Sequence, residues 1–445
     1  MRKNYFLFTL ALLLNLGVFA QQVSFEEYDL DNGLHVILHQ DNSAPVVTTA
    51  VMYHIGAKDE AKGRSGFAHF FEHLLFEGTE NIERGKWFDI VSANGGSNNA
   101  NTTQDRTYYY EVFPSNSLEL GLWMESERML HPIINQIGVD TQNEVVKEEK
   151  RQRVDNAPYG KIIYRTGVNK YIFKKHPYKN SVIGSMEDLD AAKLSEFIDF
   201  NHKYYNPNNA VLVVAGDIDV DKTKKMIQDY FGSIPNHSEK FVRTKIIEDP
   251  ITEPIIATEY DSNIQIPLKA LVYRTPGMKE RDSYVLNYIS TILTGGKSSR
   301  LYKKMVDDKK IALQVLAFAD AQEDYGTYIM GALPLGDVTF EVLTKEMDEE
   351  IEKLQNELIS DKELQKLKNQ FENQFVNSNS SIQGIANSLA RNYMLKGDTN
   401  LINKEIEIYQ SITKEDIMRV AKTYLNKNQR LELDYLPESA KKDVK

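Results

Sequence analysis

The chain has 445 residues, of which 41% are hydrophobic and 26% are charged, and its formal net charge is −11. A chain of this length can bury sizeable cores and predicts two or more domains, whereas the negative charge argues against a nucleic-acid partner or an acidic-lipid surface. The sequence contains no cysteine, which excludes disulfides and attachment of a lipid to cysteine.

The first residues have the features of a secretory signal peptide. A short basic start precedes the apolar stretch Phe6–Phe19, and Val18-Phe-Ala20 resembles a small-residue cleavage site. The apolar stretch is short for a membrane-spanning helix, and no later stretch reaches the length of about eighteen apolar residues that a span requires. We therefore expect residues 1–20 to be removed and the mature protein to be exported, periplasmic or secreted, without a stable membrane span. An uncleaved anchor is the alternative.

Alternating apolar residues predict a strand-rich start to the first half. Asn32-Gly33 lies between two alternating runs within Phe25–His39, which predicts a hairpin. Further strands are expected at Val46–His54, Ser97–Phe113 and Asn209–Asp217, and helices at Gly66–Leu75, Leu118–Met129, Gln142–Asp155, Ala191–Tyr204 and about Val220–Tyr230.

The segment Pro235–Pro254 mixes charged residues with prolines and has no sustained periodicity, which is typical of a linker. We therefore predict an N-terminal domain over residues 21–234 and a C-terminal domain over residues 255–445. The second half resembles the first weakly, since a helix ending at Gly295 has the place of one ending at Gly78. Two repeated α+β halves are a reasonable architecture for such a chain.

The segment around the first of these helices places two histidines and a glutamate in an apolar run. Helical residues three and four apart share one face, so His69 and His73 can present two imidazoles to one ion with Glu72 beside them. A catalytic zinc favours nitrogen ligands and keeps one position open for water, whose proton a nearby carboxylate can accept. His-x-x-Glu-His is the inverse of the His-Glu-x-x-His motif of metalloprotease helices. The alternative is that ordinary hydrogen bonds satisfy both histidines.

A third ligand can come from a predicted helix downstream. Two histidines and one carboxylate form a known catalytic zinc set. Val145, Val146 and Glu149 are spaced to share one inward face of that helix. All nine histidines precede residue 238, and the positions that correspond to the motif in the second half hold Leu286, Ile289 and Ser290. We therefore expect one metal site, in the first half.

With these residues the sequence resembles the M16 family of inverted-motif zinc peptidases, which includes pitrilysin, insulin-degrading enzyme and the mitochondrial processing peptidases. The family's third ligand is a glutamate at a characteristic distance after the second histidine, which Glu149 matches. Its neighbour Glu148 is the competitor, and only the register of Glu-Val-Val-Lys-Glu-Glu against the family pattern favours Glu149. Other matching segments extend along the mature chain: Phe76-Glu-Gly-Thr79, Gly95-Gly96 with Asn99-Ala100 and Thr107-x-Tyr109, Tyr205–Asp217, and Gly295–Tyr302.

The resemblance implies a fold and a mechanism. The fold would be two homologous α/β-sandwich-like domains, each a mixed, mainly antiparallel sheet packed with helices, which together form half of a clam-shell chamber. His69, His73 and Glu149 would bind one Zn²⁺ per chain, and Glu72 would be the general base. A peptide substrate would pair with the edge strand near Asn99 and Ala100. The implied activity is that of an exported zinc metalloendopeptidase acting on peptides or unfolded segments.

The sequence departs from the family pattern at two places. Gln142 occupies a position where pitrilysin-like members carry an acidic residue near the metal, so a carboxylate behind the ligands is in doubt. Val306 and Leu313 stand where many members carry a substrate-holding Arg and Tyr. Half-length members pair, and some pairs divide the zinc and the Arg–Tyr between subunits. We therefore expect a heterodimer with a second M16-like subunit, with a homodimer as the alternative.

Two other functions remain open at this point. One is a non-catalytic scaffold subunit of a peptidase complex that retains a metal for stability. The other is a periplasmic peptide-binding or metal-storage protein, which only the histidine cluster and the export signal support.

Overall fold

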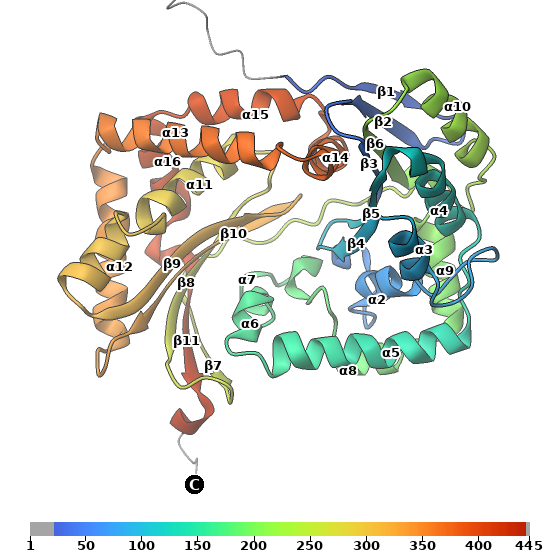
Figure 1. Cartoon of the computed structure of the whole chain (residues 1–445). Helices are drawn as coiled ribbons and strands as arrows, with labels where there is room; N and C mark the ends of the chain where they lie inside the picture. The colour runs from blue at the N-terminus through green and yellow to red at the C-terminus, as the bar shows by residue number, and fades with distance from the viewer. Residues whose placement is uncertain (1–21, 442–445) are drawn as a thin grey trace, which may run out of the picture.

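The computed structural model describes residues 22–441 and contains two β-sheets covered by helices (Figure 1). The signal peptide expected at residues 1–20 lies outside the described residues. The two sheets and their helices confirm the predicted α+β fold class. Between residues 22 and 441, none of the helices combines the length and the apolar character that crossing a bilayer would require.

The first sheet has six strands in the order β1-β2-β6-β3-β5-β4. Only β2 and β6 pair in parallel; the other neighbours are antiparallel. The central strand β6 is buried along its whole length, as its continuous apolar run predicts. The strands are β1 (Glu26–Asp29), β2 (His35–Gln40), β3 (Val46–Tyr53), β4 (Ser97–Thr102), β5 (Thr107–Pro114) and β6 (Ala210–Gly216).

The hairpin predicted around Asn32-Gly33 is present as β1 and β2. The single strand predicted at Ser97–Phe113 is wrong, because this segment is a second hairpin, β4 and β5, joined by a turn at residues 103–106. The turn closes through the Thr103 N–H, which donates to the Arg106 carbonyl at 2.9 Å. It contains no glycine or proline that would have marked it in the sequence.

The helices of the first half follow the prediction with shifts at their ends. α5 begins at Gln136 rather than Gln142, because the Asn135 side chain caps it by accepting a hydrogen bond from the Gly138 N–H at 2.9 Å. The helices are α2 (Phe67–Leu74), α3 (Trp87–Ala93), α4 (Leu118–Leu130), α5 (Gln136–Lys150), α6 (Gly160–Ile163), α7 (Asn169–Ile172), α8 (Met186–Asp190), α9 (Leu194–Tyr204) and α10 (Val220–Phe231).

The second sheet repeats the pairing of the first without a counterpart of β1. Its order is β7-β11-β8-β10-β9, with β7 and β11 parallel and the remaining pairs antiparallel. The strands are β7 (Ile255–Asp261), β8 (Leu268–Pro276), β9 (Ala312–Ala321), β10 (Tyr325–Pro334) and β11 (Arg430–Pro437), and the helices are α11 (Arg281–Thr294), α12 (Phe340–Asn356), α13 (Asp361–Ser378), α14 (Ile382–Arg391), α15 (Leu401–Gln410) and α16 (Lys414–Tyr424). Short π-helical turns extend three of the helical segments: η3 (Arg151–Asp155), η6 (Tyr302–Asp308) and η7 (Asn392–Lys396).

Residues 235–254 form neither helix nor strand. They are nevertheless bound to both halves: the Arg243 guanidinium pairs with Asp59 of the first half at 2.8 Å, and the Glu248 carboxylate pairs with Arg274 of the second half at 3.3 Å. The division into domains at this segment stays a prediction.

Each half covers the sheet of the other. Helix α14, from the second half, packs on β3 and β6 through Ile385, Ala386 and Leu389, which share one buried cluster with Ala50 and Val213. In return, α6, α7 and the residues after them pack on the second sheet: Ile162, Val168, Ile172 and Phe173 lie in one buried cluster with Leu268, Val272 and Leu431 (Figure 1). The two halves are therefore interlocked rather than only joined by the linker.

Candidate metal and catalytic site

Helix α2 carries the histidines, and its start is tightly fixed. Gly66 precedes the helix with a φ of +92°, and a Cβ there would lie 2.8 Å from the carbonyl oxygen of Ile183, so only glycine fits. The Glu60 carboxylate accepts the N–H groups of Gly66 and Ala68 at 3.0 and 2.9 Å, which satisfies two donors at the helix start. The direction in which α2 presents its polar face is thereby set.

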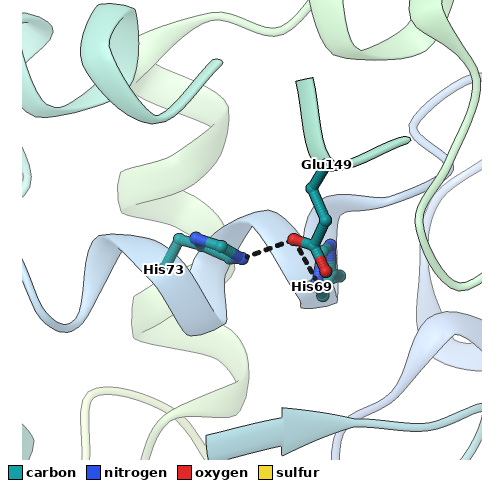
Figure 2. Close-up of side chains that lie close together, drawn as sticks. All are labelled: His69, His73 and Glu149. Atoms are coloured by element: carbon teal, nitrogen blue, oxygen red, sulfur yellow. Dashed lines mark ion pairs between the residues drawn. The ribbon is translucent and has the colours of Figure 1, made fainter. Parts of the chain in front are cut away.

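The structure brings His69, His73 and Glu149 together from α2 and α5 (Figure 2). The Nε2 atoms of His69 and His73 lie 3.5 and 3.2 Å from Oε2 of Glu149. One ligand atom from each of the three residues lies within 4.8 Å of the others. The three residues predicted as a metal site are thus a compact group with two nitrogen donors and one oxygen donor.

This donor set fits zinc. With metal–ligand distances of about 2.0–2.2 Å and tetrahedral angles, two ligand atoms on one zinc ion lie roughly 3.3 Å apart. The two contacts to Glu149, at 3.2 and 3.5 Å, are close to that separation without any rearrangement. Two imidazoles and one carboxylate also form a known catalytic set.

Glu148, the competing candidate, points away from the histidines. Its side chain is 52% exposed and bonds to Arg151 and Gln152, both at 3.0 Å. The inward face of α5 predicted to contain Val145, Val146 and Glu149 is correct only in part: Val146 is fully buried, whereas Val145 is 43% exposed. A spacing of three residues, not four, aligns the buried valine with Glu149 on this helix.

The surroundings of His69 and Glu149 shift the pKa values of these two candidate ligands. Burial and the neighbouring charge of His73 lower the pKa of His69 to about 4, so its imidazole is neutral at pH 7. Burial opposes ionisation of Glu149, but the hydrogen bond with His73 and the charge of His69 outweigh it and lower the pKa of this carboxyl. Neutral imidazole and ionised carboxylate are the forms that bind a metal.

Glu72 lies beside this group and contacts the edge strand. The Thr102 hydroxyl, at the end of β4, donates to Oε2 of Glu72 at 2.6 Å. Burial raises the pKa of Glu72 above its ordinary value. A carboxylate with a raised pKa is a stronger base, so this environment suits a group that accepts a proton.

The predicted site residues line one cavity of about 620 Å³ between the two halves. Asn99 and Ala100 lie on its wall, on β4, which among the strands of residues 22–441 pairs only with β5 and leaves its other edge open. The Asn99 side chain accepts the Ala100 N–H at 2.9 Å. Residues from the second half, among them Tyr325 and Thr327 on β10, form the opposite wall. The cavity therefore holds the motif and an open strand edge together.

The departures from the family pattern have structural counterparts. The Gln142 amide donates to Glu77, a buried carboxylate that also pairs with Arg84. Val306 packs against the core of the second half, and Leu313 is 45% exposed. Neither Val306 nor Leu313 is among the described residues that line the 620 Å³ cavity.

Sequence reasoning missed two residues that support the site. Arg153 pairs with Oε1 of Glu149 at 2.8 Å, leaving Oε2 toward the histidines. Its spacing of four residues from Glu149 on one helical face is a signal that could have identified it. Thr102 is the second, and only the position of β4 beside α2 reveals its contact with Glu72.

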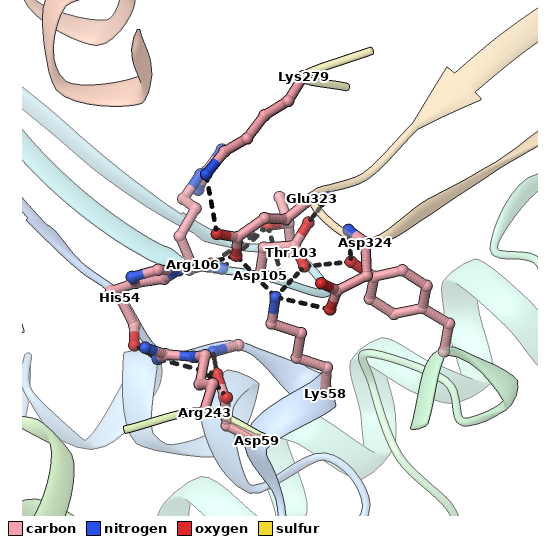
Figure 3. A network of polar contacts seen from close by, with 12 residues as sticks. His54, Lys58, Asp59, Thr103, Asp105, Arg106, Arg243, Lys279, Glu323 and Asp324 are labelled. Carbon is pink, nitrogen blue, oxygen red and sulfur yellow. Dashed lines mark hydrogen bonds and ion pairs between the residues drawn. The ribbon is translucent and has the colours of Figure 1, made fainter. Parts of the chain in front are cut away.

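A buried cluster of charges joins the two halves next to the cavity; we call Lys58, Asp105, Glu323 and Asp324 the Lys58 cluster (Figure 3). The Lys58 ammonium lies 3.0 Å from Asp105, in the β4–β5 turn. It also lies 2.7 and 3.2 Å from Glu323 and Asp324, in the turn between β9 and β10. The hydrogen bond from the Glu323 N–H to Asp105, at 2.9 Å, completes the connection. The cluster thus ties the end of the open edge strand to the opposite wall.

Comparison with known families gives matches along most of the chain. Residues 35–185 match the model described as insulinase, peptidase family M16, and residues 191–371 match the model described as peptidase M16 inactive domain. The chain is 30% identical over 424 residues to the zinc protease PqqE of Helicobacter pylori, an alignment that covers 94% of this chain and 95% of that protein.

Solved structures give the same result for the fold. A protease from Helicobacter pylori superimposes with a TM-score of 0.87 at 29% identity, covering 94% of this chain and all of that one. The first half of the periplasmic protease PqqL from Escherichia coli superimposes with a TM-score of 0.76 at 18% identity, covering 94% and 92% of the two chains. Against the whole of PqqL the match covers 92% of this chain but only 47% of that one.

Proposed function

The chain belongs to the M16 family of peptidases, and on that premise we propose that it is a zinc metalloendopeptidase that hydrolyses peptides or unfolded polypeptide segments. The observation that carries the proposal is the convergence of His69, His73 and Glu149 on one point beside Glu72, in a cavity with an open strand edge. The names of the relatives support zinc and proteolysis.

Each polar residue of the site has a role in this mechanism. His69, His73 and Glu149 would hold one Zn²⁺ per chain, and the bound ion would supply polarisation of a peptide carbonyl and a lowered pKa of water. Glu72 accepts the proton of the attacking water and passes it to the departing amine nitrogen. The hydrogen bond from Thr102 restricts the rotation of the Glu72 carboxylate, and Arg153 fixes the orientation of Glu149.

The substrate binds as an added strand. The open edge of β4 near Asn99 and Ala100 presents backbone groups to an extended peptide, which replaces the local contact between the Asn99 side chain and the Ala100 N–H. Recognition through the backbone gives affinity without reading side chains, so the proposal is a broad specificity.

The proposal includes export of the chain from the cytoplasm and pairing with a second subunit. The basic and apolar start of the sequence supports export to the periplasm or the medium. A match to one half of the longer protein PqqL, together with the apolar Val306 and Leu313, supports pairing with a second M16-like subunit that supplies the missing Arg and Tyr. A homodimer is the alternative.

A second candidate function is a metal-stabilised scaffold subunit without catalysis. The model matched by residues 191–371 is described as an inactive domain, and the apolar residues at positions 306 and 313 also favour this alternative. In this second candidate the metal site is the same as in the first, but no peptide is hydrolysed and Glu72 therefore transfers no proton.

The test combines zinc analysis with digestion of unfolded peptides by the full mature chain, alone and with the protein that co-purifies. We expect Glu72→Gln to abolish hydrolysis while the zinc content stays unchanged. Glu148→Gln, which makes the same chemical change on an exposed side chain, is the control and should leave both unchanged. Hydrolysis that survives in Glu72→Gln removes Glu72 from its role. No hydrolysis in any mixture, combined with a melting temperature that falls on chelation, establishes the scaffold.

A further inference from the structure

The second half contains a polar cavity of about 280 Å³ that is separate from the metal site. It lies among α11, α13, α14 and α15, and its size suits a small ligand or one chemical group of a larger one. Hydroxyl and amide side chains make up much of its wall, including Tyr284, Asn287, Asn379, Ser388, Asn392 and Tyr409.

The charges of this cavity do not balance. Its charged lining residues, within the described part of the chain, are Arg391, Lys396 and Glu405. The side chain of Lys396 is 3% exposed, and its ammonium pairs with Glu405 at 2.6 Å and donates to the Tyr284 hydroxyl at 2.9 Å. The single carboxylate is therefore taken by the lysine.

Arg391 has no partner of its own. Its guanidinium makes no hydrogen bond and no ion pair with any residue in the range 22–441, although the residue is partly buried. A guanidinium has five N–H donors, and a partly buried cation without an acceptor is costly. The negative end of a helix dipole does not stabilise the Arg391 charge either. Helix α14 continues directly into η7, so Arg391 lies inside the combined helical segment and not at its C-terminus.

We propose that this cavity binds a small anion, a carboxylate or a phosphate group, through Arg391 and Lys396. Such a group would accept from the guanidinium in the two-pronged geometry that arginine favours for carboxylates and phosphates. It would also balance the excess positive charge, and the surrounding hydroxyl and amide groups would complete its hydrogen bonds.

The anion can be free in solution or be an acidic group of the peptide. Arg106 contacts the open edge strand, since its guanidinium donates to the Asn101 carbonyl on β4 at 2.7 Å. Burial lowers the pKa of Arg106 to about 10; the charge of Arg391 acts in the same direction, whereas the charges of Tyr108 and Glu72 oppose the shift. The peptide source rests on the proposed peptidase function, whereas the free anion does not.

The first experiment titrates inorganic phosphate into the full mature chain and follows binding by calorimetry. We expect saturable binding of one phosphate, weakened at least ten-fold in both Arg391→Gln and Lys396→Met. Arg391→Lys, which keeps the positive charge, should retain more of the binding than Arg391→Gln. Lys422→Gln removes an exposed cation of the same half and is the matched control, with no expected effect.

The second experiment uses Glu72→Gln as background, so that binding is measured without hydrolysis. Peptide pairs that differ only by Glu against Gln at one position, or by a free against an amidated C-terminus, are compared by fluorescence anisotropy. A ten-fold preference for the acidic member that disappears with Arg391→Gln identifies the peptide as the source of the anion. Phosphate binding without such a preference identifies a free-anion site.

The proposal is overturned if phosphate fails to bind and no acidic peptide is preferred, or if Arg391→Gln and Lys396→Met leave both results unchanged while the variants keep the wild-type circular dichroism spectrum. Failure of the peptidase function alone would show as absent hydrolysis with phosphate binding intact, so the two outcomes are distinguishable.

Discussion

Apart from β1, the strands of the two halves have the same order in their sheets, but the halves differ at the first α-helix after β3 and after β8. In the first half this is α2, after β3; in the second it is α11, after β8. The predicted correspondence aligns His69, Glu72 and His73 with residues 286, 289 and 290, and Leu286 and Ile289 are buried in the second core. The same backbone position thus presents ligands to a cavity in one half and apolar side chains to a core in the other.

Converting the first half to the second at these positions should have the largest effect. We expect the double substitution His69→Leu, His73→Ser to reduce the zinc content from about one ion per chain to none, because a lone carboxylate cannot replace two imidazole ligands. Peptide hydrolysis should fall to background. Zinc that stays bound, measured by metal analysis after dialysis against a weak chelator, would contradict the assigned site.

The third ligand gives the next largest effect and has a neighbouring control. Glu149→Gln should weaken zinc binding by more than about 100-fold, because residues behind the ligands already cost roughly 10–100-fold when changed. Glu148→Gln should stay within about two-fold, since exposed substitutions away from special features have small effects. Competition with a chromogenic chelator measures both. Equal losses of zinc affinity in the two variants would contradict the assignment of Glu149, rather than Glu148, as the third ligand.

The Lys58 cluster tests how firmly the halves are joined. Lys58→Met leaves buried carboxylates without their counter-ion and should lower the free energy of unfolding by about 3–5 kcal/mol. Lys279→Met is the control on the same carboxylate: Lys279 is 50% exposed, its ammonium is 4.0 Å from Glu323, and its loss should cost less than about 1 kcal/mol. Urea unfolding of both variants measures the difference. Similar losses of unfolding free energy in the two variants would mean that solvent screens the ion pairs of the Lys58 cluster as it does exposed pairs.

The smallest expected effect is a pH dependence of the stability that the Lys58 cluster contributes. Burial opposes ionisation of Glu323, but His54 and Lys58 lower its pKa from 4.5 to about 2. Ionised Glu323 therefore stabilises the fold above about pH 4.5, and this contribution is lost as the pH falls toward 2. The stability gap between wild type and Glu323→Gln should narrow from pH 5 to pH 3 in urea titrations. A stability difference that stays constant between pH 5 and pH 3 would contradict the lowered pKa of Glu323.

Local patterns in the sequence were enough for most of the first sheet and its helices. Asn32-Gly33 identified a hairpin, and the apolar run at residues 210–216 identified the buried centre of the sheet. The turn at residues 103–106 was missed because its Thr-Gln-Asp-Arg sequence has no glycine or proline, and the start of α5 was missed because its cap, Asn135, precedes the apolar periodicity.

For the candidate site, the spacing of residues along the sequence predicted the metal ligands, whereas the contacts around them could not be predicted. The spacing in His69–His73 placed both imidazoles on one face, and resemblance to a family selected Glu149 over Glu148; in the structure Glu149 contacts both histidines, whereas Glu148 is exposed. The Lys58 cluster could not be predicted, because it joins residues from distant parts of the sequence that only the tertiary fold brings together. The same holds for Arg391, since its lack of a partner among residues 22–441 is a property of the folded molecule.

The mutual covering of the two sheets has a consequence for how this chain is made. The ribosome releases the strands of the first sheet long before α14, so an apolar face that includes Ala50, Met52, Val211 and Val213 has no cover in the nascent chain. A face exposed in this way attracts chaperones and invites aggregation.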